Sequence, residues 1–487
     1  MKTNKLNSTI LWVICIALPF NLLAQVNEIP ITTSSSEALK FFKDGRGKSE
    51  DFKMAEAASL FDKAIQKDPN FARAYLYRAQ SGGGNTIYMQ NLEKAISLAD
   101  KVSEGEKLEI EYFKSSGEGN GEKQKELLMQ LLKSFPSDKR VQGLAGIYYY
   151  SINDFQAALR YFNKSAEIDP KYASAFNMIG YCQSALNNYP ESEKAFRTYI
   201  SLSPNSPNGY DSYAELLLKT GKYDESIAQY KKALQYDPSF SSSLAGIGNN
   251  YIFKGDYEAA RKNYQEYYDK SLLINGKFDA LFLKAVSYIY EEKPEQAIAT
   301  LEEYRDLAEK KNLTTNAIGS YINQGYILTE TGNPAEGIKH FTKADELLGT
   351  SKLSEVTMEN FNTYLKIWKF YALTANAEYD KAKIESENCR QKVELRKNPG
   401  EEMWLNGLYA FNELKKGDYD QAIQYYSKAD QEDPMNWYYL GVAYSKKGDK
   451  QSASQWFDKV TKLNVNSLNL ALVRKRASQE LNSISVR

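Results

Sequence analysis

The residue types that most often carry catalysis and bind metals are scarce in this sequence. Its 487 residues include a single histidine, His340, and three cysteines. Zinc sites, Ser-His-Asp triads and Cys-His pairs usually depend on imidazole, so one histidine excludes most of these arrangements. His340 precedes Phe341 in an amphipathic stretch and is typical of a surface or boundary residue. We therefore expect no catalytic residue, no metal site and no enzymatic activity.

Two further patterns could in principle serve chemistry. Gly82-Gly83-Gly84 lacks the Lys-Ser/Thr pair of a phosphate-binding loop, so it predicts a loop between helices. Adjacent carboxylates such as Glu302-Glu303 point in different directions on a helix, which is typical of a solvated face. The sequence predicts no bound cofactor.

Charge and composition narrow the classes of partner. Lysine and arginine together number 62, as do aspartate and glutamate, so the chain is close to neutral. A surface that follows phosphates needs a basic excess on one face, and only short basic runs such as 474–476 occur. We expect no nucleic-acid partner.

Hydrophobic residues make up 42% of the chain, which is enough to bury a core.

The positions of these residues follow an internal repeat. Four prolines recur every 34 residues, at Pro136, Pro170, Pro204 and Pro238, and each closes a segment with the periodicity of an amphipathic helix. Small and aromatic residues recur at the same interval. The small set is Gly146, Gly180, Ala214 and Gly248, and one aromatic set is Phe162, Phe196, Tyr230 and Tyr264. Small residues allow two antiparallel helices to approach closely, while aromatic rings fill the space between neighbouring hairpins.

The pattern resembles the tetratricopeptide-repeat family. The residues that carry the resemblance are Tyr210-Asp211-Ser212-Tyr213-Ala214, Gly221-Lys222-Tyr223, Ser226, Tyr230, Ala233 and Asp237-Pro238. The match is close over 139–271 and looser elsewhere. It implies an all-α fold, a right-handed superhelical solenoid of antiparallel helix pairs, in which the first helix of each pair lines a groove that contacts other proteins.

The expected organisation combines this repeat with the less regular stretches. It consists of a signal peptide at 1–24, a flexible lead-in at 25–36, an N-terminal repeat array at 37–276, further repeat-like hairpins at 277–351, a degenerate helical region at 352–402, and C-terminal hairpins with a capping helix at 403–487. In 352–402 the proline and glycine registers fail, so whether this region forms true repeats stays open.

The N-terminus predicts export. Lys2 and Lys5 precede the apolar run from Ile10 to Leu23 and then the small residue Ala24, which is the order of a secretory signal peptide. The run is shorter than the roughly 20 residues of a membrane span, so we expect cleavage, a periplasmic or secreted protein, and no transmembrane segment afterwards. Cleavage would leave Cys182 and Cys389, which lie far apart in sequence. Whether these two cysteines are free stays open.

Candidate partner-binding residues flank the small and apolar positions of three predicted first helices. They are Asn177, Tyr181, Asp211, Glu215 and Asn249, and Phe253 joins them as an expected aromatic anchor one helical turn beyond Asn249. Residues that flank a packed position on a helix point elsewhere, here toward the groove, unless they are solvated side chains without a ligand.

The leading hypothesis is a non-enzymatic exported scaffold that binds a protein or peptide partner through its concave face. The alternative is a cell-envelope glycan-binding or small-ligand-binding protein, because the 37 tyrosines could supply rings that stack on sugars.

Overall fold

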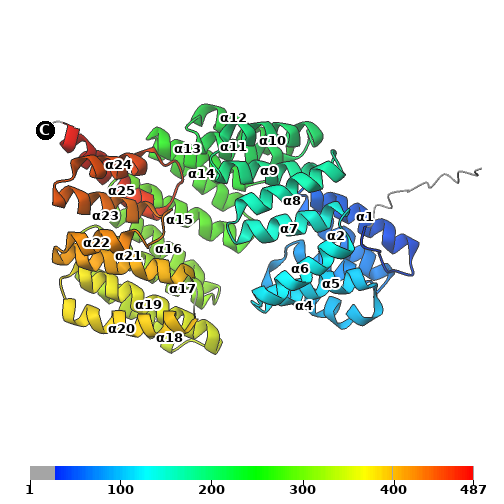
Figure 1. Ribbon diagram of the computed structural model, residues 1–487, viewed down its shortest axis with the longest axis horizontal. Helices are drawn as coiled ribbons and strands as arrows, with labels where there is room; N and C mark the ends of the chain where they lie inside the picture. Colours follow the sequence, from blue (N-terminus) through cyan, green and yellow to red (C-terminus); the bar gives the residue numbers. More distant parts are fainter. Residues whose placement is uncertain (1–27, 397–398, 486–487) are drawn as a thin grey trace, which may run out of the picture. The chain divides into compact units, whose positions relative to one another are not determined.

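The computed structural model describes residues 28–396 and 399–485 (Figure 1). Within these residues there are 25 α-helices, one 3-10 helix and no strand. Consecutive helices pack against each other as hairpins, which confirms the predicted all-α fold of paired helices. The predicted signal peptide, residues 1–24, lies outside the described residues. The chain divides into two compact units, unit 1 up to Cys182 and unit 2 from Gln183.

The described part of unit 1 consists of helical hairpins in chain order. Its helices are α1 (Ser36–Glu50), α2 (Met54–Lys67), α3 (Ala72–Gln80), α4 (Gly84–Ser97), η1 (Ala99–Lys101), α5 (Glu104–Gly117), α6 (Gly121–Ser134), α7 (Lys139–Ser151), α8 (Phe155–Ile168) and α9 (Ala173–Ala185), the last of which crosses into unit 2. In every hairpin the odd-numbered α-helix is the first helix and the even-numbered one is the second.

Unit 2 continues the same plan. Its helices are α10 (Tyr189–Leu202), α11 (Pro207–Lys219), α12 (Tyr223–Tyr236), α13 (Ser242–Lys254), α14 (Tyr257–Lys270), α15 (Ile274–Tyr290), α16 (Pro294–Lys310), α17 (Thr314–Glu330), α18 (Pro334–Gly349), α19 (Glu355–Ala375), α20 (Tyr379–Arg396), α21 (Pro399–Lys416), α22 (Tyr419–Tyr426), α23 (Pro434–Lys447), α24 (Lys450–Lys462) and α25 (Leu468–Ser485). The region 352–402, where the registers fail, is largely helical.

A residue in the left-handed backbone conformation makes the turn between the two helices of several hairpins. Asn153, Asn187, Gly221 and Gly255 hold this place at 34-residue intervals, with φ of 60°, 62°, 78° and 78°. Glycine and asparagine adopt this conformation at the least cost. Asp154 follows Asn153, and its side chain accepts the backbone N–H of Ala157, which caps α8. Turn and cap together fix where the second helix begins.

Glycines of the first helices lie under aromatic rings of the second helices. A Cβ at Gly146 would lie 2.5 Å from the Phe162 ring, and Gly248 faces Tyr264 in the same way. Side chains do not approach this closely, so these positions require glycine. The same pairing over 16 residues recurs at Gly45 and Phe61, Gly325 and Phe341, and Gly441 and Phe457. The small and aromatic registers therefore extend beyond the most regular part of the sequence.

Residues 28–35, which the composition predicts to belong to a flexible lead-in, are held against unit 1. Ile29 is 3% exposed, and its backbone N–H donates to the Asp138 carboxylate over 2.9 Å. The backbone N–H of Thr32 donates to Glu106 over 2.9 Å. Carboxylates on α5 and just before α7 therefore accept the backbone N–H groups of this segment and hold it in place. The serine and threonine content, on which the prediction of flexibility rested, gives no sign of these contacts.

The last helix also differs from the expected capping helix. α25 packs against α24, as a terminal helix would, but it also contacts α15 and α23, which are not its neighbours in sequence. Leu470, Val473 and Ala477 are completely buried. Apolar residues on its first turns are enclosed by first helices of unit 2, so α25 joins distant hairpins of the array.

The sequence predicts no transmembrane segment after cleavage and leaves the state of the two cysteines open. Among the described helices, none combines the length with the apolar character that crossing a bilayer demands. Cys182 and Cys389 are buried and form no disulfide among the described residues. Burial raises the pKa of the Cys182 thiol to about 12.

Candidate partner-binding site on the first helices of unit 2

The six predicted partner-binding residues lie on α9, α11 and α13 and differ in exposure. On α9, Asn177 is 2% exposed and Tyr181 is half-buried. On α11, Glu215 is exposed, whereas Asp211 is partly buried and accepts a hydrogen bond from the Ser243 hydroxyl over 2.5 Å. Burial, with a smaller contribution from Glu215, raises the pKa of Asp211 to about 7.

The two remaining residues, on α13, contact a distant part of the same chain. Asn249 Oδ1 accepts hydrogen bonds from Asn466 Nδ2 and from the Tyr264 hydroxyl, both over 2.8 Å. The guanidinium carbon of Arg474 lies 4.8 Å from the centre of the Phe253 ring. These two predicted positions therefore bind a polypeptide segment, and that segment belongs to the chain itself.

This C-terminal segment, residues 464–476, makes further contacts along the array. The Tyr223 hydroxyl donates to Asn464 Oδ1 over 2.9 Å. Lys475 pairs with Glu292 just beyond α15. Arg476 Nη2 donates to Glu330 Oε2 over 2.8 Å at the end of α17. The four successive hairpins from α11–α12 to α17–α18 thus each contribute a side chain that holds the segment.

Glu330 is the most densely contacted acid in this region. Its side chain is 2% exposed, and besides Arg476 it accepts hydrogen bonds from the hydroxyls of Tyr371 and of Tyr439, the latter over 2.9 and 3.0 Å. Burial opposes the charge of Arg476, but the Glu330 carboxylate holds the pKa of that guanidinium above its usual range. One carboxylate therefore ties together α17, α19, α23 and α25.

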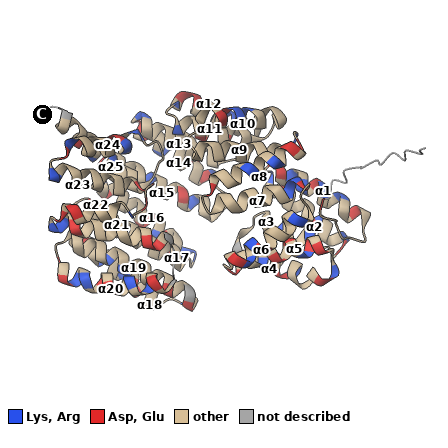
Figure 2. Ribbon diagram, in the orientation of Figure 1, with Lys and Arg blue, Asp and Glu red and all other residues tan. Residues whose placement is uncertain are grey.

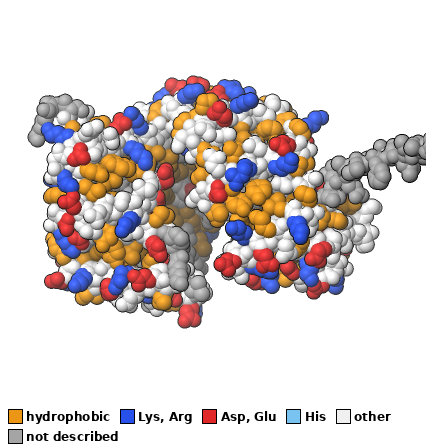
Figure 3. Space-filling model, in the orientation of Figure 1, with side chains coloured by type: hydrophobic (Ala, Val, Ile, Leu, Met, Phe, Trp, Pro, Cys, Tyr) orange, Lys and Arg blue, Asp and Glu red, His pale blue; other side chains and the backbone are white. Residues whose placement is uncertain are grey.

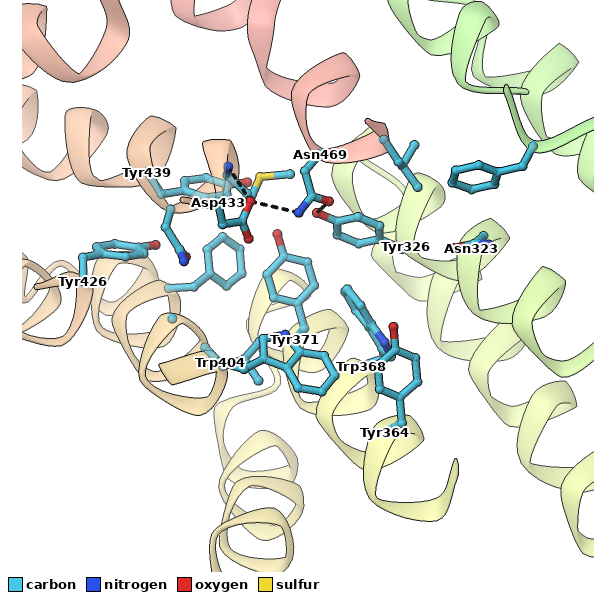
Figure 4. Close-up of a pocket in the computed structure, with 17 residues that line it drawn as sticks. Asn323, Tyr326, Tyr364, Trp368, Tyr371, Trp404, Tyr426, Asp433, Tyr439 and Asn469 are labelled. Atoms are coloured by element: carbon cyan, nitrogen blue, oxygen red, sulfur yellow. Dashed lines mark hydrogen bonds between the residues drawn. The ribbon is translucent and has the colours of Figure 1, made fainter. Parts of the chain in front are cut away.

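A cavity of about 330 Å³ opens beside this carboxylate on the same first helices (Figure 4). It is lined by Phe282, Asn323, Tyr326, Tyr364, Trp368, Tyr371, Trp404, Gly407, Leu408, Phe411, Tyr426, Asp433, Met435, Asn436, Tyr439, Leu468 and Asn469. We call it the aromatic cavity. Its lining contains one carboxylate and no lysine or arginine.

Aromatic rings from α17, α19 and α21 form most of the wall. Tyr364, Trp368 and Tyr371 rise from α19 into the cavity, opposite Asp433 and Asn469 (Figure 4). The ring centres of Tyr326 and Trp368 are 4.6 Å apart, those of Tyr364 and Trp404 are 5.0 Å apart, and those of Trp368 and Trp404 are 6.0 Å apart. These spacings are typical of packed aromatic side chains.

Asp433 faces this wall from the start of α23. Its Oδ1 accepts the backbone N–H of Met435 and the side-chain amide of Asn469, each over 2.9 Å, and the Tyr326 hydroxyl donates to Asn469 Oδ1 over 3.0 Å. Among the described side chains, no lysine or arginine forms an ion pair with Asp433. Burial raises the pKa of Asp433.

The Tyr426 hydroxyl is a further polar group at the aromatic cavity. The residue is 1% exposed, and within the described residues its hydroxyl has no hydrogen-bond partner. A buried hydroxyl without a partner is costly, so a group that enters the cavity would relieve that cost.

Sequence reasoning missed the aromatic cavity, because the registers fail over much of the region that supplies it. Trp368 and Trp404 were the available signal, since they are two of only five tryptophans and both lie within or beside 352–402. A second recess of about 550 Å³ shares Tyr364 and Trp404 with the cavity and is otherwise lined by Asn360, Phe361, Thr363, Ile367 and Glu401. The two together extend the site along α19 and α21.

The visible surface of unit 2 has no dominant charge. Lysine, arginine, aspartate and glutamate are interspersed along its helices (Figure 2), and hydrophobic side chains reach this face in small patches broken by charged residues (Figure 3). The aromatic cavity is therefore distinguished by its chemistry and not by a general property of the surface.

Comparison with known families decides how this architecture is classified. The tetratricopeptide-repeat family matches residues 144–207, 207–240, 279–308 and 412–464. These stretches of the chain are tetratricopeptide repeats. The matched stretches include α11, α12, most of α15, α23 and α24, whereas α19, which supplies Tyr364, Trp368 and Tyr371 to the cavity wall, lies outside them.

Two curated proteins similar to this chain are eukaryotic. The chain is 26% identical over 208 residues to anaphase-promoting complex subunit 3 of Schizosaccharomyces pombe, covering 42% of this chain and 30% of that protein. It is 26% identical over 115 residues to Hsp70-Hsp90 organizing protein 3 of Arabidopsis thaliana, covering 24% and 21%. The chain thus spans less than a third of either relative.

Solved structures of tetratricopeptide-repeat proteins are similar over shorter stretches. One, from Parabacteroides merdae, is 13% identical and has a TM-score of 0.34, with 58% of this chain and 98% of that chain covered. Another, YrrB, described as having an unusual peptide-binding site, is 17% identical with a TM-score of 0.28, covering 38% and 94%.

Proposed function

We propose that this tetratricopeptide-repeat protein is a scaffold that binds segments of partner proteins on the first helices of unit 2. The observation that carries the proposal is the C-terminal segment. Asn249, Phe253 and Glu330 already hold it through side-chain contacts, so this series of helices is built to bind a polypeptide.

The aromatic cavity is where we propose that a partner is bound. It lies on α17, α19 and α21, beside the residues that hold the C-terminal segment, and tyrosine and tryptophan are the side chains most enriched at interface hot spots. The names of the two relatives, a complex subunit and an organizing protein, also favour a role in assemblies with other proteins.

A test compares two half-buried tryptophans in the full-length protein. Trp404 lines the aromatic cavity on a first helix, whereas Trp456 lies on α24, a second helix, away from the cavity lining. The tagged protein is purified from its own cells, and co-purifying proteins are quantified by mass spectrometry. We expect Trp404→Ala to lower recovery of specific partners about fivefold and Trp456→Ala to leave it unchanged. Equal recovery with both variants, each checked by circular dichroism, would reject the site.

A second candidate function is binding of a small ligand in the same cavity. Its favouring observation is a recess of about 330 Å³ enclosed by rings and amides, a size and lining that suit small molecules.

We also propose that the protein is exported to the periplasm or secreted. The support is the order of basic residues, apolar run and Ala24 at the N-terminus. N-terminal sequencing of protein recovered outside the cytoplasm should begin close to Gln25; recovery of the intact Met1 terminus there would contradict cleavage.

A further inference from the structure

Aromatic rings make up much of the lining of the aromatic cavity. Tyr326, Trp368 and Trp404 come from three successive first helices, with ring centres 4.6 and 6.0 Å from one to the next. The face of an aromatic ring carries partial negative charge and attracts cations, tryptophan most strongly. A cluster of such rings therefore favours a positively charged guest over an anionic one.

The charges around the cavity point in the same direction. Asp433 is the single carboxylate of the lining, and the lining contains no lysine or arginine. Glu330, which lies outside the lining and contacts the lining residues Tyr371 and Tyr439, is already paired with Arg476 and accepts hydrogen bonds from both tyrosines. The cavity therefore carries an uncompensated negative charge.

Asp433 and Tyr426 each have unused hydrogen-bonding capacity. Both hydrogen bonds to Asp433 go to Oδ1, and Figure 4 shows the other carboxylate oxygen directed toward the centre of the cavity. The Tyr426 hydroxyl is buried without a partner among the described residues. A buried carboxylate without a counter-ion is costly, so a cation that entered here would lower that cost.

The size of the cavity selects an organic cation. A volume of about 330 Å³ would be mostly empty around a single metal ion, and rings do not supply the oxygen ligands that hard cations need. The adjoining recess, with Glu401, continues along Tyr364 and Trp404. An alkylammonium or guanidinium group on a longer chain can therefore fill the cavity while its stem lies along the recess.

We infer that the aromatic cavity of unit 2 binds an organic cation, with the rings of Tyr326, Trp368 and Trp404 around the charged group and Asp433 as its counter-ion. The inference rests on the proposed binding function of this face and adds the chemical class of the group that is recognised. That group is either a lysine or arginine side chain of a partner protein or a free alkylammonium compound.

The experiment titrates full-length protein with choline and with 3,3-dimethyl-1-butanol, its uncharged isostere, and follows tryptophan fluorescence. We expect choline to change the emission saturably and to bind about tenfold more tightly than the isostere. Equal affinities, or binding of neutral saccharides with no response to choline, would overturn the inference.

Two matched variants separate the counter-ion from the helix cap. Asp433 and Asp449 are the capping residues before α23 and α24, and each accepts a backbone N–H of its helix. Asparagine caps helices as well as aspartate, so both Asp→Asn variants should fold. Asp433→Asn should lower choline affinity about tenfold, and Asp449→Asn should leave it unchanged. Unchanged affinity in Asp433→Asn would overturn the role of this carboxylate.

The source of the cation is resolved with peptides. A nine-residue peptide with one central lysine is compared with the same peptide carrying acetyl-lysine and with choline. Tighter binding of the lysine peptide than of choline assigns the group to a protein, and the reverse assigns it to a free alkylammonium compound. If Trp404→Ala loses partner capture while Asp433→Asn captures partners normally, the inference that the cavity recognises a cation is rejected. The proposal that the protein is a scaffold would still stand.

Discussion

The hairpins α11–α14 and α19–α22 share one plan but use their first helices differently. α11 and α13 are each 13 residues long and keep the small and aromatic registers, as at Gly248 under Tyr264. α19 and α21 are 21 and 18 residues long and supply the rings of the aromatic cavity. The 34-residue spacing of small and aromatic residues thus specifies how helices pack against each other. The longer helices that lack this spacing instead place large aromatic side chains around a cavity.

The largest expected effect concerns the irregular hairpins. Glu330→Ala removes the carboxylate that binds Arg476, Tyr371 and Tyr439, and it leaves a guanidinium without its counter-ion. We expect a loss of about 3 kcal/mol in the free energy of unfolding by urea. Glu336→Ala, a partly exposed acid on α18, should change it by less than about 0.5 kcal/mol. Similar small losses in both variants would deny that Glu330 holds these hairpins together.

A second test addresses the regular hairpins. Gly248→Ala places a Cβ against the Tyr264 ring, whereas Gly319→Ala on α17 meets nothing within 4 Å. Gly248→Ala should lower the free energy of unfolding by about 2 kcal/mol because the site becomes overpacked. Gly319→Ala should raise it by roughly 0.5 kcal/mol because alanine favours the helix more than glycine does. Equal melting temperatures would remove the distinction between required and incidental glycines.

The third test is the pH dependence of Asp211. Its folded pKa of about 7 lies above the ordinary value of 3.8, so folding takes up a proton between these pH values. Its stabilising contribution is complete below pH 4 and is lost as the pH rises through 7. Asp211→Asn should therefore stabilise unit 2 by roughly 2 kcal/mol at pH 8 and leave it nearly unchanged at pH 4. A pH-independent difference between the two proteins would contradict the buried carboxylate.

The smallest effect concerns the contact between the regular hairpin α13–α14 and the C-terminal segment. Asn466→Ala removes hydrogen bonds from Asn466 to Asn249 and to Tyr264. We expect a loss of about 1 kcal/mol. A double-mutant cycle with Asn249→Ala should show a coupling between the two sites; strictly additive effects would mean that the contact does not form in solution.

The sequence predicts the hairpins well, because the features that form them repeat. Prolines, small residues and aromatic residues at 34-residue intervals identify the helix pairs, and the left-handed series Asn153, Asn187, Gly221 and Gly255 could have been found in the same way. The aromatic cavity could not be predicted, because its residues are spread from Phe282 to Asn469 and only tertiary packing brings them together. The contact of Asn249 with Asn466 spans 217 residues and leaves no periodic signal.

The C-terminal segment has a consequence for the order of folding during synthesis. Each hairpin of unit 2 needs only local contacts and can form soon after its own residues leave the ribosome. Asn464 and Asn466, by contrast, meet Tyr223 and Asn249 from 241 and 217 residues away. The nascent array therefore spends the translation of more than 200 residues with these first helices uncovered. A chaperone bound there during translation would have to leave before α25 could dock.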